Sequence, residues 1–276
     1  MISIIVGIFA RIVSNSYVNV FQKILTQRGA KTSAVNFFTY LGLTFILLPF
    51  FKFFNFLFSS ELLINFIFMG ILGALGNYFI IKALSLADLS SLAPINSYKP
   101  LVALLFGFLY LNEIPNSLAF AGICLIITGT VFLYNTKINH NKLAVFYRIL
   151  ALVFSGTEAV FIKKIVLLSD IPTSFFLWAL SGLIFSLFLV SPKLSKINIP
   201  DLKYLFFVIL CIGIMQYSTN FVFSKINVSY ALALFQLSSL LSVLLGAGVF
   251  NEKNIKEKLA ACLIMVTGAV LIILAE

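Results

Sequence analysis

The chain has 276 residues, of which 61% are hydrophobic and only 10% are charged, and its formal net charge is +10. Soluble globular domains contain about 45–50% apolar and about 25% charged residues, so this composition excludes a water-soluble fold. A helix that crosses a bilayer needs about 20 residues, and ten such helices leave no room for a catalytic domain outside the membrane. We therefore predict an all-α membrane protein that is not an enzyme.

Apolar runs follow one another along the whole chain, with short polar or proline-containing breaks between them. In lipid the backbone has no water to bond, so each run must be a helix. The first set covers 3–27, 32–54, 62–86, 90–111 and 116–134, and the second covers 143–168, 173–190, 203–225, 228–250 and 256–274. The sequence thus predicts ten transmembrane helices.

The two sets of runs are related by an internal repeat. A shift of 139 residues places Asn112-Glu113 on Asn251-Glu252 and Thr128-Gly129 on Thr267-Gly268 without a gap. Five crossings in each half is an odd number, so the second half must be inverted relative to the first. We predict two inverted five-helix repeats, at 1–135 and 143–276, joined by a short linker at 136–142.

Several short motifs of the first half occur in a recognisable order. The stretch 78–84 leads into Ser91-Leu92-Ala93-Pro94, then into 109–113, Gly122 and 127–129. In this order they resemble the EamA-type signature of the drug/metabolite transporter superfamily, over nearly the whole chain. The resemblance implies ten helices in two repeats and transport of small metabolites, amino acids or drugs. Because Ala233 and Ser239 stand where the first half has Pro94 and Pro100, we expect no proline-broken helix in the second half.

Two charged residues lie near the centres of apolar runs, where ionisable groups usually have a function. Lys99 is central in 90–111, and Glu158 is central in 143–168. In one interpretation Lys99 attracts a substrate carboxylate or phosphate, and Glu158 attracts an ammonium group or a coupling proton. In the other, the two side chains form a structural ion pair with each other. A pair that opens to admit a zwitterion satisfies both interpretations.

The surroundings of Lys99 favour a binding site. Pro94 and Pro100 each remove a helical hydrogen bond, and interrupted helices are where transporter sites tend to form. Asn96 and Tyr98 lie between the two prolines. Other polar residues far from helix ends predict a hydrated, substrate-binding cavity as a set, although each alone is better explained as an interhelical hydrogen bond. These are Asn15, Asn19, Asn77, Tyr78, Gln216, Tyr217, Asn220 and Gln236.

Some residues are given a structural interpretation instead. Arg11 lies near one end of its run and can snorkel to the interface, which makes it a weak candidate. Trp178, the only tryptophan, is interpreted as a packing or interfacial residue, and the series Gly70, Gly73, Gly76 as a close helix contact. Glu113 and Glu252 are expected to cap turns between helices.

No motif for a nucleotide, a metal or a cofactor is visible, and His140 stands alone in a polar connection. The positive charge is interpreted as topology signal and not as nucleic-acid binding. Most Lys and Arg residues lie on the side of the odd-numbered connections, which places both termini outside the cytoplasm, whereas the resemblance implies termini inside, so the orientation stays open.

We therefore expect a multi-pass protein of a bacterial inner (cell) membrane whose partners are lipid and a small molecule, without a requirement for oligomers. The favoured function is secondary transport of a small polar or zwitterionic metabolite, with an amino acid as one example, by alternating access and with a proton as the simplest coupling ion. The alternatives are an exporter of hydrophobic cations or drugs that depends on Glu158, and a non-transporting membrane scaffold.

Overall fold

The computed structural model is helical throughout the part of the chain that it describes, as the sequence predicts. That part comprises residues 2–56, 59–87, 92, 94–134, 141–189, 201–238, 241, 244–245, 248–249 and 255–275. The first half contains α1 (Ile2–Gln27), α2 (Thr32–Leu47), the 3-10 helix η1 (Leu48–Phe53), α3 (Ser60–Leu84), the 3-10 helix η2 (Pro94–Tyr98), α5 (Lys99–Leu111) and α6 (Ser117–Tyr134). The second half contains α7 (Lys142–Leu168), α8 (Ile171–Leu187), α9 (Leu202–Phe223), α10 (Val228–Phe235) and α12 (Ile255–Ala275).

Five of these helical stretches are long and apolar enough to cross a membrane: α1, α2 with η1, α3, α7 and α9. At about 1.5 Å per residue, each of them exceeds the hydrocarbon thickness of about 30 Å. Each of the ten predicted runs contains at least one of the observed helices, but α5, α6 and α8 are shorter. The multi-pass membrane fold is therefore confirmed, and the number of ten crossings stays a prediction.

The outward surface of the bundle is strongly apolar. Phe45, Phe9 and Leu109 are 74%, 67% and 65% exposed, and many other large apolar side chains share this surface. Soluble monomers rarely expose apolar patches of this extent. The same surface is favourable in lipid, where hydrocarbon replaces water as the solvent.

Polar residues fix where several helices begin and end. The side chains of Ser59, Asn141 and Asp170 accept backbone N–H groups in the first turns of α3, α7 and α8. Such caps satisfy donors that have no partner within the helix. Asn112 ends α5 in the left-handed conformation, with φ of 55°, which Asn tolerates better than most residues.

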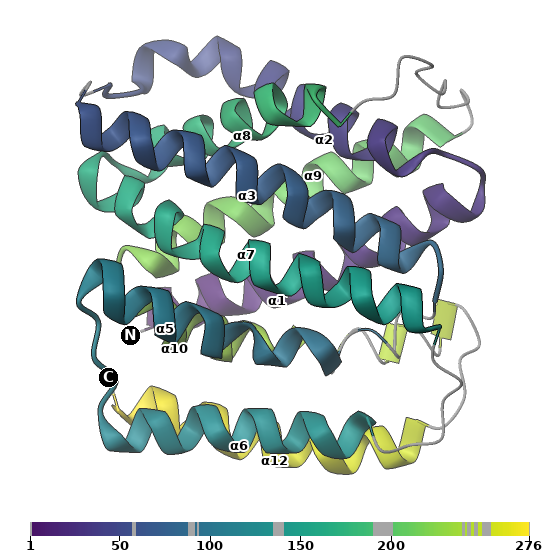
Figure 1. Cartoon of the computed structure of the whole chain (residues 1–276), viewed down its shortest axis with the longest axis vertical. Coiled ribbons are helices and arrows are strands. Elements are labelled where there is room, and N and C mark those ends of the chain that lie inside the picture. Colours follow the sequence, from purple (N-terminus) through teal and green to yellow (C-terminus); the bar gives the residue numbers. More distant parts are fainter. Residues whose placement is uncertain are drawn as a thin grey trace.

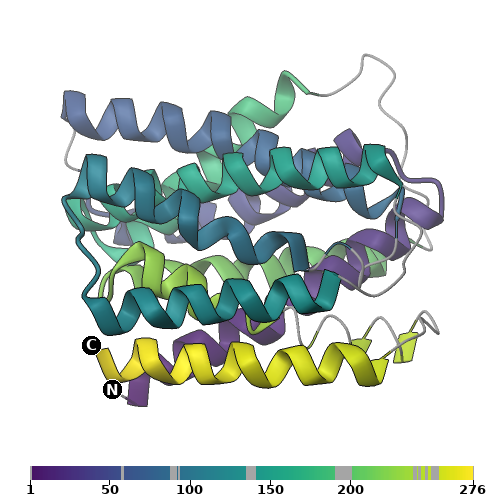
Figure 2. The same cartoon turned by 60° about the horizontal axis from the view of Figure 1, so that its bottom comes forward.

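The two halves of the chain interlock instead of forming separate bundles. α1 packs along α9, α3 packs along α7, and α6 packs along α12 (Figures 1 and 2). Gly122 and Gly268 permit the last of these contacts, because a Cβ on either would lie 2.6 Å from the other's carbonyl oxygen. Both termini lie at the same end of the bundle (Figure 1). The division into two inverted five-helix repeats, at 1–135 and 143–276, stays a prediction.

Candidate functional site

A polar cavity lies between the two halves of the chain, in the middle of the bundle. Residues of α1, α2, α3, η2 and α5 line it from the first half, and residues of α7, α8, α9 and α10 line it from the second. Its free volume is about 90 Å³, which is room for several water molecules. Seven of the predicted site residues line it, namely Asn15, Asn19, Asn77, Asn96, Lys99, Glu158 and Gln216.

Glu158 is the acidic side chain of the cavity and is held by the neighbouring helices. It is 7% exposed, and the indole N–H of Trp178 on α8 donates to its Oε1 at 2.6 Å. Gly73 on α3 leaves space for the carboxylate, because a Cβ there would lie 2.5 Å from the same oxygen. Trp178 and Gly73 therefore position Glu158, which is a closer involvement than the packing roles expected for them.

Lys99 enters the cavity at the point where a helix is interrupted. η2 covers Pro94–Tyr98 and passes directly into α5 at Lys99, so the predicted break around the two prolines is observed in the backbone. Lys99 and Glu158 interact electrostatically across the cavity. Among the ion pairs of the described residues none joins them, so the simple structural pair is not formed in this conformation.

Two arginines line the same cavity. Arg148 on α7 is 6% exposed, and its Nε donates to the carbonyl oxygen of Leu92 at 3.2 Å. Arg11 on α1 lies over the ring of Phe235, with 5.0 Å from its guanidinium carbon to the ring centroid. Its Nε and Nη1 are buried without a hydrogen-bond partner. Sequence reasoning undervalued both residues, because each lies in the first three turns of its helix.

Behind the cavity wall, amide side chains hold one another in place. Asn77 donates to Asn36 at 2.5 Å, and Gln22 donates to Asn77 at 3.3 Å. On the opposite side, the amides of Gln216 and Asn220 are hydrogen-bonded at 2.8 Å. Asn220 also bonds the hydroxyl of Ser174 at 2.9 Å. Asn220 was predicted as a binding residue but lies behind the lining, where it supports Gln216.

The interrupted helices of the two halves meet at the cavity. Asn96 in η2 donates to the side-chain oxygen of Gln236 at 3.0 Å, immediately after the end of α10. α10 ends at Phe235 although the second half has no proline there, so this helix ends without the proline break of the first half. Residues 236–237 form a tight turn, in which the backbone N–H groups of Gln236 and Leu237 donate to carbonyl oxygens only three residues earlier. The Gln236 side chain donates to the carbonyl oxygen of Leu232 and accepts from Asn96. Ser239 lies outside the described residues.

Three predicted tyrosines and one glutamine do not line the cavity. Tyr98 and Tyr217 are 38% and 46% exposed, and the ring of Tyr78 packs edge-on against Phe79. Gln236 is buried and is hydrogen-bonded to two lining residues, to the side chain of Asn96 and to the carbonyl oxygen of Leu232. Tyr40, Ser155 and Thr219 line the cavity although sequence reasoning did not select them. Their hydroxyl groups carry no sequence signal that distinguishes them from other polar residues in the helices.

Ionic contacts join the elements at the end of the bundle where α7 finishes. Lys163 forms a buried ion pair with Glu113 and donates to the carbonyl oxygen of Ile226 at 2.8 Å. Glu113 also accepts from the backbone N–H of Val228, the first residue of α10, at 2.8 Å. The expected capping role of Glu113 is therefore observed, whereas Asn251-Glu252, like His140, lie outside the described residues.

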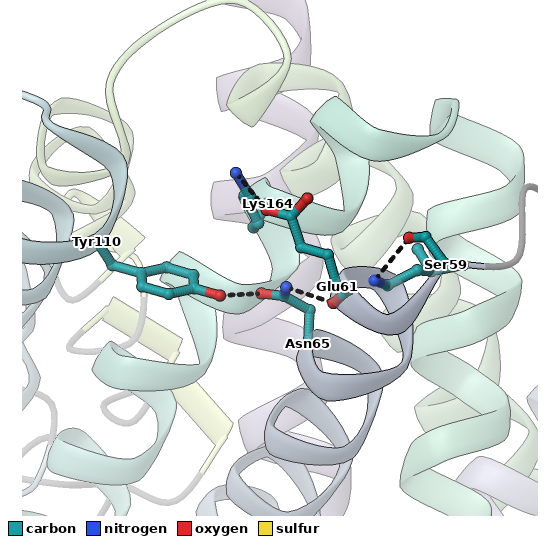
Figure 3. Close-up of polar contacts among 6 residues, drawn as sticks. Ser59, Glu61, Asn65, Tyr110 and Lys164 are labelled. Atoms are coloured by element: carbon teal, nitrogen blue, oxygen red, sulfur yellow. Dashed lines mark hydrogen bonds and ion pairs between the residues drawn. The ribbon is translucent and has the colours of Figure 1, made fainter.

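A second lysine of α7 forms an ionic contact with α3. Lys164 pairs with Glu61 at 2.8 Å, and Asn65, one turn further along α3, donates to the carbonyl oxygen of Glu61 at 2.7 Å (Figure 3). Tyr110 of α5 donates to Asn65 at 3.3 Å (Figure 3). Consecutive lysines on α7 thus hold three other segments at one end of the cavity.

The chain matches one protein family and a number of solved structures. The sequence profile of the EamA-like transporter family matches residues 2–135 and 142–274, which confirms the resemblance of the motifs. Chains of solved structures also match, and one, titled "Crystal structure of protein", has a TM-score of 0.72 at 17% identity. That match covers 99% of this chain and 97% of the other, and at this identity it shows the fold alone. No curated protein matches the chain.

Proposed function

Since the chain belongs to the EamA-like transporter family, we propose that this membrane transporter moves a small polar or zwitterionic metabolite, such as an amino acid, by alternating access. The observation that carries the proposal is the pair of opposite charges in the cavity. Lys99 from the first half and Glu158 from the second half line one cavity without forming an ion pair, among the described residues. An amine and a carboxylate that face a common space can bind the two ends of a zwitterion.

The position of the cavity supports alternating access. Its wall is built from both halves, so a movement of one half relative to the other changes the wall and the route to it. The ion pairs of Lys163 and Lys164 join several segments at one end of the bundle. In the proposed cycle these pairs open when the opposite end closes. The proposed inverted relation of the two repeats supplies two such conformations by symmetry.

The charge of the cavity argues against the nearest rival function. An exporter of hydrophobic cations needs Glu158 and has no use for Lys99. Three basic side chains, those of Arg11, Lys99 and Arg148, line the cavity with that single carboxylate among the described residues. They repel a cation at close range and in low dielectric.

Solute uptake into liposomes that contain only the purified full-length chain tests the proposal. Uptake of polar metabolites from a labelled mixture is expected, and Lys99→Ala is expected to reduce it strongly while membrane insertion stays normal. Lys203→Ala, which removes an exposed lysine near the start of α9, is the matched control. Undiminished uptake by the Lys99→Ala variant would remove Lys99 from the site, and the absence of any flux from the wild-type protein would favour a scaffold.

A proton gradient is the driving force that we propose. The sequence shows no nucleotide-binding motif, and Glu158 is a buried acid in the cavity that can take up and release a proton. Glu158→Gln keeps the hydrogen-bond acceptor for Trp178 and removes the titration. We expect this variant to exchange substrate between the two sides but to lose accumulation driven by a pH gradient. Normal accumulation would point to another ion.

A further inference from the structure

The unpaired donors of the cavity indicate the charge of the substrate. The described part of the cavity wall contains the basic groups of Arg11, Lys99 and Arg148 but one acidic group, that of Glu158. A buried charge without a partner is strongly unfavourable, and proteins usually pair it or hydrogen-bond it. An excess of buried positive charge therefore has to be balanced by something that enters the cavity.

Arg11 is the most informative of these groups. Its Nε and Nη1 are buried and have no hydrogen-bond partner, although a guanidinium group carries five N–H donors. The contact with the ring of Phe235 at 5.0 Å compensates part of the charge but satisfies none of these donors. The guanidinium group matches a carboxylate in shape and charge.

Two further donors face the same cavity without an acceptor. Ser155 Oγ is buried and has no hydrogen-bond partner. Lys99 makes no hydrogen bond or ion pair within the described part of the chain, and its charge repels that of Arg11. Arg148, in contrast, is bonded to the carbonyl oxygen of Leu92. Donors from α1, α5 and α7 that have no hydrogen-bond acceptor thus converge on one space.

We propose that the substrate is a small metabolite with net negative charge, and that Arg11 and Lys99 bind its carboxylate groups. This inference rests on the proposed transport function and narrows its substrate class. An amino dicarboxylate fits three of the four charged groups of the cavity wall: its two carboxylates neutralise Arg11 and Lys99, and its ammonium group binds Glu158. The fourth, Arg148, is bonded to the carbonyl oxygen of Leu92. A simple zwitterion leaves one of the two cations unpaired.

Four probes with similar chains and different charge test this inference by binding alone. The full-length protein in detergent is heated with glutarate, glutamate, glutamine or lysine, and the midpoint of unfolding is measured. A ligand that binds only the folded protein raises this midpoint. We expect glutarate and glutamate to raise it, and glutamine and lysine to leave it unchanged. Stabilisation by glutamine equal to that by glutamate, or none by either acid, would overturn the proposal.

A variant of Arg11 assigns the effect to the residue. Arg11→Gln is expected to weaken glutarate binding by about 10-fold or more, the equivalent of one charge-assisted hydrogen bond. Without ligand its unfolding midpoint should not fall, because the variant removes an unpaired buried charge. Arg28→Gln is the matched control, since Arg28 is half-exposed and pairs with Asp201 at 3.2 Å. If Arg11→Gln lowers the ligand-free midpoint and binds glutarate normally, Arg11 is structural and the inference is wrong.

Flux measurements separate this inference from the function on which it rests. If glutarate and glutamate stabilise the protein but do not enter liposomes, transport is contradicted, while binding of carboxylates at Arg11 and Lys99 is supported. If glutamine or lysine is taken up in preference to glutamate, the preference for negatively charged substrates is contradicted, while the transport function is supported.

Discussion

Gly73 determines where the carboxylate of Glu158 lies, so Gly73→Ala is expected to displace it. The new Cβ would lie 2.5 Å from Oε1, whereas ordinary contacts begin at 3.4 Å, and the oxygen has to move by about 1 Å. That movement lengthens the 2.6 Å hydrogen bond from Trp178 beyond bonding distance. The change is a small one in volume, but it acts on the one acidic group among the described residues of the cavity wall.

The free energy of this change follows from two opposing effects. A hydrogen bond to a charged group contributes about 1.5–3 kcal/mol, and Ala in place of Gly stabilises a helix by up to about 1 kcal/mol. We expect Gly73→Ala to lower the free energy of unfolding by about 0.5–2 kcal/mol. Gly107→Ala is the control, because its Cβ would meet the nearest atom at an ordinary 3.6 Å and the residue does not line the cavity.

Tryptophan fluorescence measures the displacement directly, since Trp178 is the only tryptophan of the chain. Loss of the negative charge beside the indole nitrogen should shift the emission of Gly73→Ala to shorter wavelength. Uptake into liposomes should fall in the same variant, while Gly107→Ala keeps wild-type emission and uptake. Wild-type emission from Gly73→Ala would refute the reasoning, because it would mean that the carboxylate has room to move without leaving Trp178.

Two further predictions concern the helix ends. Glu113→Gln leaves Lys163 buried without its ion-pair partner and should lower the free energy of unfolding by about 3–5 kcal/mol. Adding Lys163→Met should restore most of this free energy. If the double variant instead loses the sum of what the two single variants lose, the pairing is contradicted. At the start of α8, burial raises the pKa of Asp170, but hydrogen bonds from Thr173 and Asn55 outweigh this and hold its pKa below the ordinary value. The ionised Asp170 carboxylate therefore stabilises the folded protein above the ordinary pKa, and this stabilisation is lost as the pH falls through the pKa of the folded state. Asp170→Ala should lower the free energy of unfolding by about 1 kcal/mol at neutral pH and leave it unchanged in acid. Thermal unfolding at the two pH values measures the difference.

The helices could be predicted from the sequence because lipid permits little else. The predicted run 143–168 corresponds to α7 at Lys142–Leu168, and 62–86 corresponds to α3 at Ser60–Leu84. The central charges were found for the same reason, since an ionisable residue in the middle of an apolar run is conspicuous. Lys99 and Glu158 were found without tertiary information, because each lies near the centre of a predicted apolar run.

The residues that were undervalued depend on contacts distant in the sequence. Arg148 lies near the start of α7 and looks like an interfacial charge, but it is buried and its Nε donates to the carbonyl oxygen of Leu92. Trp178 meets Glu158 only because α8 packs beside α7. The break after Phe235 has no proline signal, since the turn is held by the side chain of Gln236 and its partner Asn96.

The fold pairs cations with acids at the end of α7 but leaves positive charge in excess in the described wall of the cavity. The chain has only 9 acidic residues, and Glu61 and Glu113 both pair with lysines at the end of α7. The same fold thus pairs cations where two helices are joined and leaves Arg11 without a hydrogen-bond acceptor at the cavity. If Arg11 had only a structural role, we would expect it to be paired with an acid, because the energetic penalty of an unpaired charge is largest in the interior. The distribution is the one expected if the missing acid arrives with the substrate.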